Sequence, residues 1–166
     1  MDKNFEKLIS YFPIVQLPFT LEKGVEHDFG MTNDMLPATL FEELMAPNLP
    51  FELDEFTELL PGYHWRTESE GFVTVFWVAR LLRYSFFVFS YDKEGKWLDN
   101  AEIAGLIYEN NELWHRIANI SDAQTIYVVE ASMPDENSLI NASETSKWML
   151  EITTEGIFKQ FDASDM

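Results

Sequence analysis

The chain has 166 residues, of which 46% are hydrophobic and 15% are Phe, Trp or Tyr, and its formal net charge is -18. An aromatic-rich chain of this length can bury a core, so the composition excludes intrinsic disorder and predicts one soluble domain over residues 1–166. The absence of cysteine excludes disulfides, thiolate zinc sites and cysteine nucleophiles.

We expect residues 1–70 to form a helical, proline-rich layer. Apolar residues recur at helical spacing in residues 2–12, which predicts a helix with one buried face; they are Phe5, Leu8, Ile9 and Phe12. Six of the seven prolines lie between Pro13 and Pro61, which excludes long helices and continuous strands there. Two more short helices are predicted at residues 38–45 and 53–60, each ending before a proline.

From residue 71 to residue 166, the pattern is typical of an antiparallel sheet. Segments rich in β-branched and aromatic residues predict six strands and a short seventh, at residues 72–82, 84–91, 97–104, 113–120, 125–131, 147–153 and 157–161. Short turns at residues 92–95, 121–123 and 154–156 would join antiparallel neighbours. The predicted fold class is therefore α+β, with short N-terminal helices packed on a curved antiparallel β-meander of six or seven strands. Residues 133–146 are the best candidate for a mobile loop.

The first two predicted strands are apolar on both faces. An antiparallel strand with one buried face would alternate between apolar and polar residues, so both faces of these strands must be covered. The N-terminal helices can cover one face. The other face requires the sheet to curl over itself, a second subunit in a homodimer, or a bound apolar ligand.

The apolar run of residues 71–91 is long enough for a membrane span, but Arg80 and Arg83 lie in its middle. Two arginines at that depth would cost about 2.5–3.5 kcal/mol each. We therefore expect strands there and no membrane partner. The charged N-terminus leads into an amphipathic run and is not a secretory signal, which predicts a cytoplasmic protein if Met1 is the native start.

The negative charge is unevenly distributed along the chain. Residues 22–70 hold 12 acids and 2 bases, and residues 107–166 hold 11 acids and 3 bases, whereas the rest of the chain is neutral. Such a field repels nucleic acid and attracts basic partners. We expect no nucleic-acid partner, and a charge that serves only solubility is the alternative explanation.

The sequence lacks the short motifs of common enzyme classes. A nucleophile elbow, a phosphate-binding loop, a dinucleotide fingerprint and a zinc-protease helix are all absent. His27, His64 and His115 lie far apart in the sequence, so a metal site would require the fold to bring them together. We expect no metal and no cofactor.

Any binding site is predicted in the segment that precedes the first long strand. This segment places aromatic, basic and acidic side chains close together: Tyr63, His64, Trp65, Arg66, Glu68 and Glu70. A rigid scaffold commonly presents functional groups at such a position, although an aromatic pair there also seals a core. If Glu68 or Glu70 approaches His64, the pKa of His64 should rise above about 6.5.

The C-terminal half carries a resemblance to a group of proteins without a known function. The residues that carry it are Ser90 to Lys96, Glu102 and Ile103, Thr125 to Val128, and Glu151 to Gly156. This strand-and-turn pattern resembles that of uncharacterised small proteins of Bacteroidetes bacteria. The resemblance implies no activity and no site residue.

Three functions remain open. The first is a non-catalytic acidic module that binds a basic protein partner, in the manner of small acidic immunity or inhibitor proteins, which the chain resembles in size and charge. The second is a carrier that holds an apolar ligand on the second face of the sheet. The third is an enzyme whose pocket combines His64, Glu68, Glu70 and His115. The binding module ranks first because the charge is a property of the sequence itself, whereas both pockets depend on an unknown fold.

Overall fold

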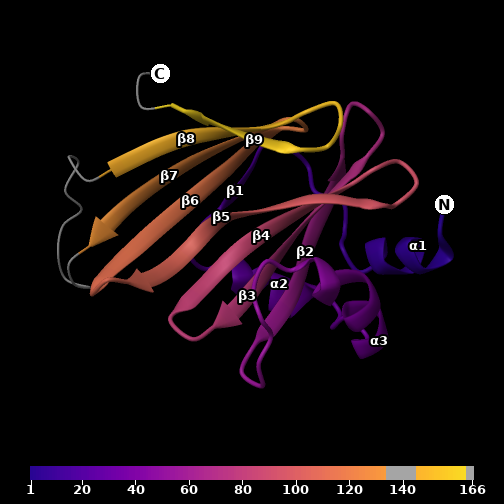
Figure 1. The fold of residues 1–166 in the computed structure, drawn as a ribbon, viewed down its shortest axis with the longest axis horizontal. Helices are drawn as coiled ribbons and strands as arrows, with labels where there is room; N and C mark the ends of the chain where they lie inside the picture. Colours follow the sequence, from indigo (N-terminus) through magenta and orange to yellow (C-terminus); the bar gives the residue numbers. More distant parts are fainter. Residues whose placement is uncertain (134–144, 164–166) are drawn as a thin grey trace.

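The structure is a computed structural model that describes residues 1–133 and 145–163 of the chain. Within these residues, nine strands form one antiparallel sheet with helices packed against it (Figure 1). The helices are α1 (Lys3–Ile9), α2 (Val25–Thr32), α3 (Ala38–Leu40), a π-helix (Phe41–Met45) and a 3-10 helix (Ala46–Asn48). The strands are β1 (Phe19–Leu21), β2 (Glu58–Arg66), β3 (Phe72–Arg80), β4 (Arg83–Tyr91), β5 (Trp97–Glu109), β6 (Glu112–Asp122), β7 (Thr125–Met133), β8 (Thr145–Ile152) and β9 (Phe158–Asp162).

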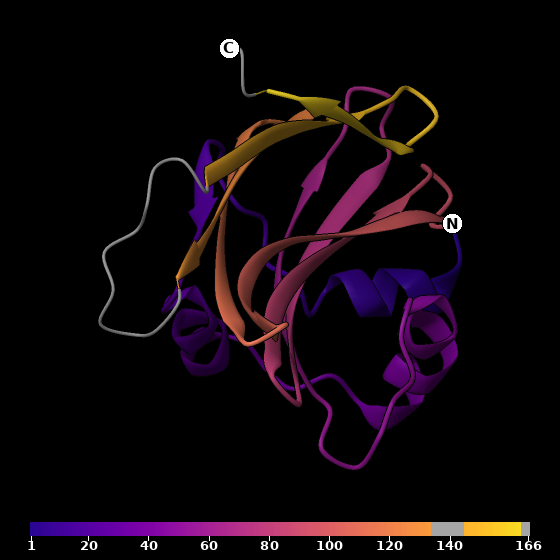
Figure 2. The same ribbon diagram turned by 60° about the vertical axis from the view of Figure 1, so that its left-hand side comes forward.

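The sheet is a meander. Strands β2 to β9 follow one another in chain order, each antiparallel to the next, and β1 pairs with β6. The sheet curls strongly without closing (Figure 2). The predicted α+β fold, with short helices on a curved antiparallel meander, is therefore confirmed. The described part of the chain has more strands than the six or seven predicted, because β1 and β2 form within residues 1–70. Most of the loop predicted at residues 133–146 lies outside the described residues.

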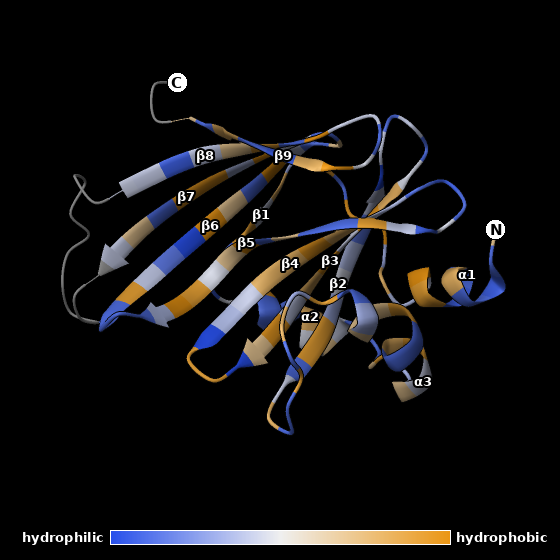
Figure 3. Ribbon diagram, in the orientation of Figure 1, coloured by the Kyte–Doolittle hydropathy of each residue, from blue (hydrophilic) through white to orange (hydrophobic). Residues whose placement is uncertain are grey.

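Both faces of β3 and β4 are buried, as their sequences predict, and Figure 3 shows β4 hydrophobic along much of its length. One face contributes Val75 and Val88 to a core that also contains residues of α2, β1 and β6 to β8. The other face contributes Phe76 and Phe89 to a second core, which is covered by Phe5 and other residues of the N-terminal helices. The curled sheet, together with α2 and β1, thus covers the face that the other helices leave open, so neither a second subunit nor a ligand is needed for that purpose.

A bulge in β5 accompanies the curl. The register between β4 and β5 shifts between Phe86 and Phe87, which leaves an extra residue in β5. Gly105 follows with φ 132°, and a Cβ there would lie 2.6 Å from Ser85 Cα and closer still to the Tyr84 carbonyl oxygen. Bulges of this kind bend a strand and increase its twist. Glycine is required at this position because the backbones approach so closely.

The helix predicted at residues 53–60 is wrong. The Asp54 carboxylate accepts hydrogen bonds from the Phe56 amide at 2.8 Å and from the Thr57 hydroxyl at 3.1 Å, which forms a local turn. Strand β2 then begins at Glu58, and Leu60 pairs with Trp77 of β3. This turn competes with the first turn of a helix, and pairing with β3 stabilises the strand.

The helices predicted at residues 2–12 and 38–45 are confirmed. Helix α1 begins after Asp2, whose side chain accepts a hydrogen bond from the Asn4 amide at 2.6 Å. The second prediction corresponds to α3 and the π-helix that continues it. Helix α2 has no counterpart in the prediction, because its buried side is limited to Phe29 and its sequence shows little apolar periodicity.

Glu102 is the centre of an ion cluster that joins several strands. Its carboxylate accepts hydrogen bonds from Arg80 at 3.0 Å, from Arg83 at 2.9 Å and from Ser85 at 2.8 Å. Arg116 lies 3.7 Å away and also pairs with Glu130 at 2.6 Å. The Glu102 side chain is only 13% exposed. Burial raises its pKa, but the hydrogen bonds and the arginines outweigh burial and hold the pKa below its usual value.

Among the described residues, none of the helices combines the length and the hydropathy that a membrane crossing requires.

Candidate functional site

The predicted segment begins with aromatic residues that pack into the first core. Tyr63 contacts the rings of Phe19 and Phe29 edge-on, with centroids 5.3 and 5.2 Å away. Trp65 is 4% exposed, and its indole N–H donates to the Ala123 carbonyl at 3.2 Å. These two side chains join β2 to β1, α2 and the turn after β6, which is a structural role.

His64 holds the segment after α1 against the edge of β2. Its amide donates to the Pro13 carbonyl at 2.9 Å, and its carbonyl accepts from the Val15 amide at 3.1 Å. Its ring Nδ1 contacts the Phe12 carbonyl, which can only accept, so Nδ1 carries the proton. Burial lowers the pKa of His64 below its usual value, the Phe12 carbonyl opposes this effect, and Arg66 adds to the lowering. The expectation that acidic neighbours raise this pKa is therefore wrong.

Arg66, Glu68 and Glu70 lie at the end of β2 and in the turn to β3, and all three side chains are exposed. Arg66 lies over the Phe72 ring at 4.0 Å and donates to the Glu70 backbone carbonyl at 2.6 Å. No hydrogen bond or ion pair joins the Glu68 or Glu70 carboxylate to His64 within the described residues. The six predicted site residues are thus divided between core packing, the edge of β2 and a solvent-exposed turn.

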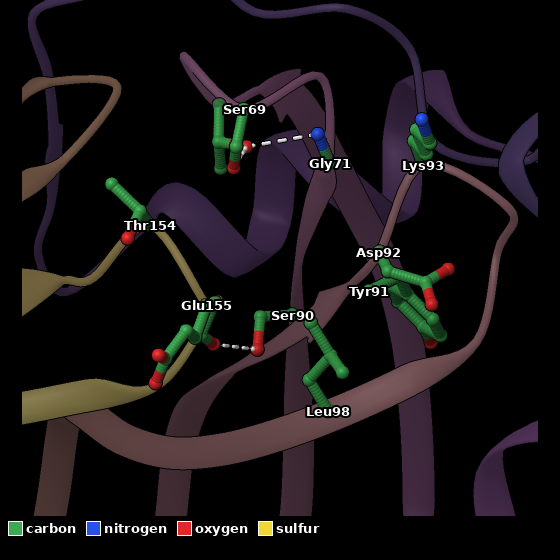
Figure 4. A pocket seen from close by; sticks show the side chains of 11 residues that line it. Ser69, Gly71, Ser90, Tyr91, Asp92, Lys93, Leu98, Thr154 and Glu155 are labelled. Atoms are coloured by element: carbon green, nitrogen blue, oxygen red, sulfur yellow. Dashed lines mark hydrogen bonds between the residues drawn. The ribbon is translucent and has the colours of Figure 1, made fainter.

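A small polar cavity of about 190 Å³ lies beside this turn, between the loop after β2, the end of β4 and the turn before β9 (Figure 4). Two of its hydroxyl groups have backbone partners. Thr67 Oγ1 accepts from the Gly71 amide at 2.9 Å, and Ser90 Oγ donates to the Gly156 carbonyl at 2.5 Å. The first bond closes the β2–β3 turn and the second ties β4 to the turn before β9, so these two hydroxyls have structural roles.

A larger groove of about 660 Å³ lies between the α3 region and the first residues of β2. We refer to it as the acidic groove. Its apolar walls come from Leu36, Phe41 and Leu49 on the helical side, and from Leu59, Leu60 and Val78 on the side of the sheet. Its polar lining includes Glu42, Asp54, Thr57 and Glu58. This volume lies within the range of about 300–1,000 Å³ that is typical of ligand sites.

The wall formed by Phe41 and Glu42 belongs to the π-helix. The Ala46 amide donates to the Phe41 carbonyl, five residues earlier, in place of the usual four. Short π-helical turns are rare and occur often at functional sites. Phe41 and Glu42 both line the acidic groove, which gives this wall an apolar and a charged side chain at adjacent positions.

Exposed apolar side chains surround the mouth of the acidic groove. Met35 is 69% exposed and Leu53 is 41% exposed, and both line it. Phe56, which lies between the lining residues Asp54 and Thr57 in sequence, is 73% exposed. Single exposed apolar residues are common, but several around one apolar groove are typical of an interaction surface.

The stretch of chain that supplies most of the acidic groove's lining carries charge of one sign. Residues 34–58 contain seven acids and no Lys or Arg, and all seven side chains are exposed. They are Asp34, Glu42, Glu43, Glu52, Asp54, Glu55 and Glu58. In the described part of the chain, none of the ion pairs involves any of these carboxylates. The groove therefore combines an apolar floor with unpaired negative charge, an arrangement suited to a ligand that is both apolar and basic.

The sequence contains the acidic run but gives no sign of the groove. Its two walls are formed by segments about 20 residues apart, and the expected helix at residues 53–60 would have placed the second wall differently. The interleaving of acids with Met35, Leu53 and Phe56 is the only sequence pattern that could have drawn attention to this region.

In the part of the chain that the structure describes, no three His, Asp or Glu side chains are placed to hold a metal ion.

The chain matches no protein-family model, no curated protein and no solved structure. The resemblance to small proteins of Bacteroidetes bacteria stays a prediction.

Proposed function

We propose that this protein is a non-catalytic binding module that presents its acidic groove to a basic protein partner. The observation that carries the proposal is the combination of an apolar groove of about 660 Å³ with a surrounding stretch of seven exposed acids and no bases. Protein interfaces commonly have an apolar centre and a polar rim. Here the rim would select for positive charge on the partner.

The carboxylates have a second role in this proposal. A concentration of one charge on a surface steers an oppositely charged partner and raises its association rate, and salt weakens this effect. Because the seven acids lack ion-pair partners on the protein, their charge is available to the partner. Charge that served solubility alone would need no apolar groove at its centre.

A carrier of a small apolar ligand is the second candidate, and the same groove favours it by its volume and apolar walls. A carrier that holds its ligand on the second face of the sheet has no support, because side chains of the curled sheet fill that face. An enzyme centred on His64 has less support, because the His64 ring contacts a backbone carbonyl and no carboxylate.

The proposal can be tested by following backbone amide NMR signals while a lysine-rich peptide is added. We expect shift changes concentrated in residues 34–60, and weaker binding as salt increases. Replacing Glu42 and Glu58 by glutamine should weaken binding, whereas replacing the exposed Glu112 and Glu151 should change it little. Shift changes spread over every acidic surface, with all four replacements equivalent, would leave the charge as a solubility device and refute the proposal.

A further inference from the structure

The acidic groove also indicates which kind of basic segment it would hold, and this inference rests on the proposed function. We infer that the groove binds one face of a basic amphipathic helix: an apolar stripe enters the groove, and Lys or Arg residues on both flanks of the stripe meet the carboxylates.

The first argument is the position of the charges relative to the apolar walls. Glu42 lies on the helical wall, whereas Asp54 and Glu58 lie on the opposite wall, beside β2. The groove is also lined by apolar side chains from both sides, among them Phe41 of the π-helix and Leu59 of β2. A complementary ligand therefore needs an apolar stripe with a positive charge on each side of it. A helix with apolar residues at i, i+3, i+4 and i+7 and basic residues beside them has this arrangement.

The second argument concerns the alternative of an added strand. A peptide that extends a sheet must form backbone hydrogen bonds with an open strand edge. At the edge of β2, Asn33 already donates to the carbonyls of Pro61 and Gly62, at 2.7 and 2.9 Å. Pro61 itself has no N–H to donate. This part of the edge is therefore unsuitable for strand addition, and the ligand must bind mainly through side chains.

The third argument is the character of the exposed apolar residues. Met35 and Leu53 line the groove and remain more than a third exposed, with Phe56 beside them. Methionine is flexible and polarizable, and it is over-represented on surfaces that bind amphipathic helices. These side chains can close over an apolar stripe that the buried part of the groove covers incompletely.

The experiment compares three synthetic peptides of about 18 residues, or five helical turns. The first contains Leu and Lys with Leu at helical spacing. The second has the same composition in an order that disperses Leu around the helix. The third keeps the Lys residues and replaces each Leu by Ser. Calorimetric titration of the full chain at physiological salt should give a Kd at least about tenfold lower for the first peptide than for the other two.

Variants of the protein locate the effect. Replacing Met35 and Leu53 by serine should remove most of the preference for the first peptide. The matched control is Ile157→Ser, which changes a 42% exposed isoleucine just before β9, at the opposite end of the strand order from β2. Since all three of these apolar side chains are exposed, none of these changes should unfold the protein, and a thermal melt verifies this.

The outcomes separate the inference from the proposed function. If all three peptides bind equally and the serine variants change nothing, the protein binds basic segments without reading an apolar stripe, and the inference is wrong while the proposed function survives. If no basic peptide binds, both fail. If an apolar dye binds in the groove and no peptide displaces it, the site belongs to a small ligand and the inference is overturned.

Discussion

Replacing Glu102 by glutamine should destabilise the protein strongly. The carboxylate is 13% exposed and accepts hydrogen bonds from two arginines and a serine, while a third arginine lies 3.7 Å away. Glutamine has a similar shape but no charge, so three arginines lose their common partner. Removing one member of a buried ion cluster typically costs about 3–5 kcal/mol. This is a large share of the roughly 5–15 kcal/mol by which a domain of this kind is stable.

Urea denaturation followed by fluorescence measures this loss. With a slope of about 2 kcal/mol per molar, the midpoint should fall by about 2 M without a change in slope. The control is Glu112→Gln, an exposed position on β6 that should change stability by less than about 0.5 kcal/mol. Because the pKa of Glu102 is lowered in the folded protein, its stabilising effect should be present above the ordinary pKa of 4.5 and lost as the pH falls below it. A loss under about 1 kcal/mol would refute the view that Glu102 ties these strands together.

Two further predictions concern the backbone and pH. Gly105→Ala should lower the free energy of unfolding, measured by urea denaturation, by more than about 3 kcal/mol because the new methyl group overlaps the backbone of β4. Gly24→Ala, at φ 106° with no atom within 4 Å, should lower it by only about 1–2 kcal/mol. Equal losses in the two variants would mean that the positive φ alone determines the destabilisation. The lowered pKa of His64 means that the unfolded chain binds a proton more readily, so stability should decline as the pH falls through about 6.5. His64→Gln should make the melting temperature depend less on pH between pH 7.5 and pH 5.5. Part of the dependence should remain, because burial also lowers the pKa of His115. A melting temperature that varies with pH in the variant as it does in the original protein would contradict this assignment.

Most of the sheet could be predicted from the sequence because its determinants are local. Gly95 and Gly156, in two of the turns, have φ values of 89° and 82°, which glycine adopts without strain. The apolar residues on both faces of β3 and β4 require a covering layer on each side of the sheet. Strand β2 was hidden because Pro61 interrupts its pattern and the Asp54 turn imitates the start of a helix. Pairing with β3, which depends on residues distant in sequence, decides its structure.

The candidate site could be predicted only in part. The excess of negative charge between residues 22 and 70 is evident in the sequence, but proximity along the chain was a poor guide to proximity in space. The acids nearest to His64 in sequence project from a turn, whereas a carbonyl from the end of the α1 segment contacts its ring. The acidic groove requires the π-helix to pack beside the start of β2, and no local pattern encodes that contact.

The most direct test of the central claim is a charge exchange at the acidic groove. A variant with Glu42→Lys and Glu58→Lys changes the net charge from -18 to -14, so the protein as a whole stays strongly acidic. The measurement is the Kd of this variant and of the original protein for a Leu/Lys amphipathic helix and for the same helix with Glu in place of Lys. If the groove is the site, the variant should lose at least about tenfold in affinity for the basic helix and gain affinity for the acidic one. If the variant binds both helices as the original protein does, the groove is not where a basic partner binds.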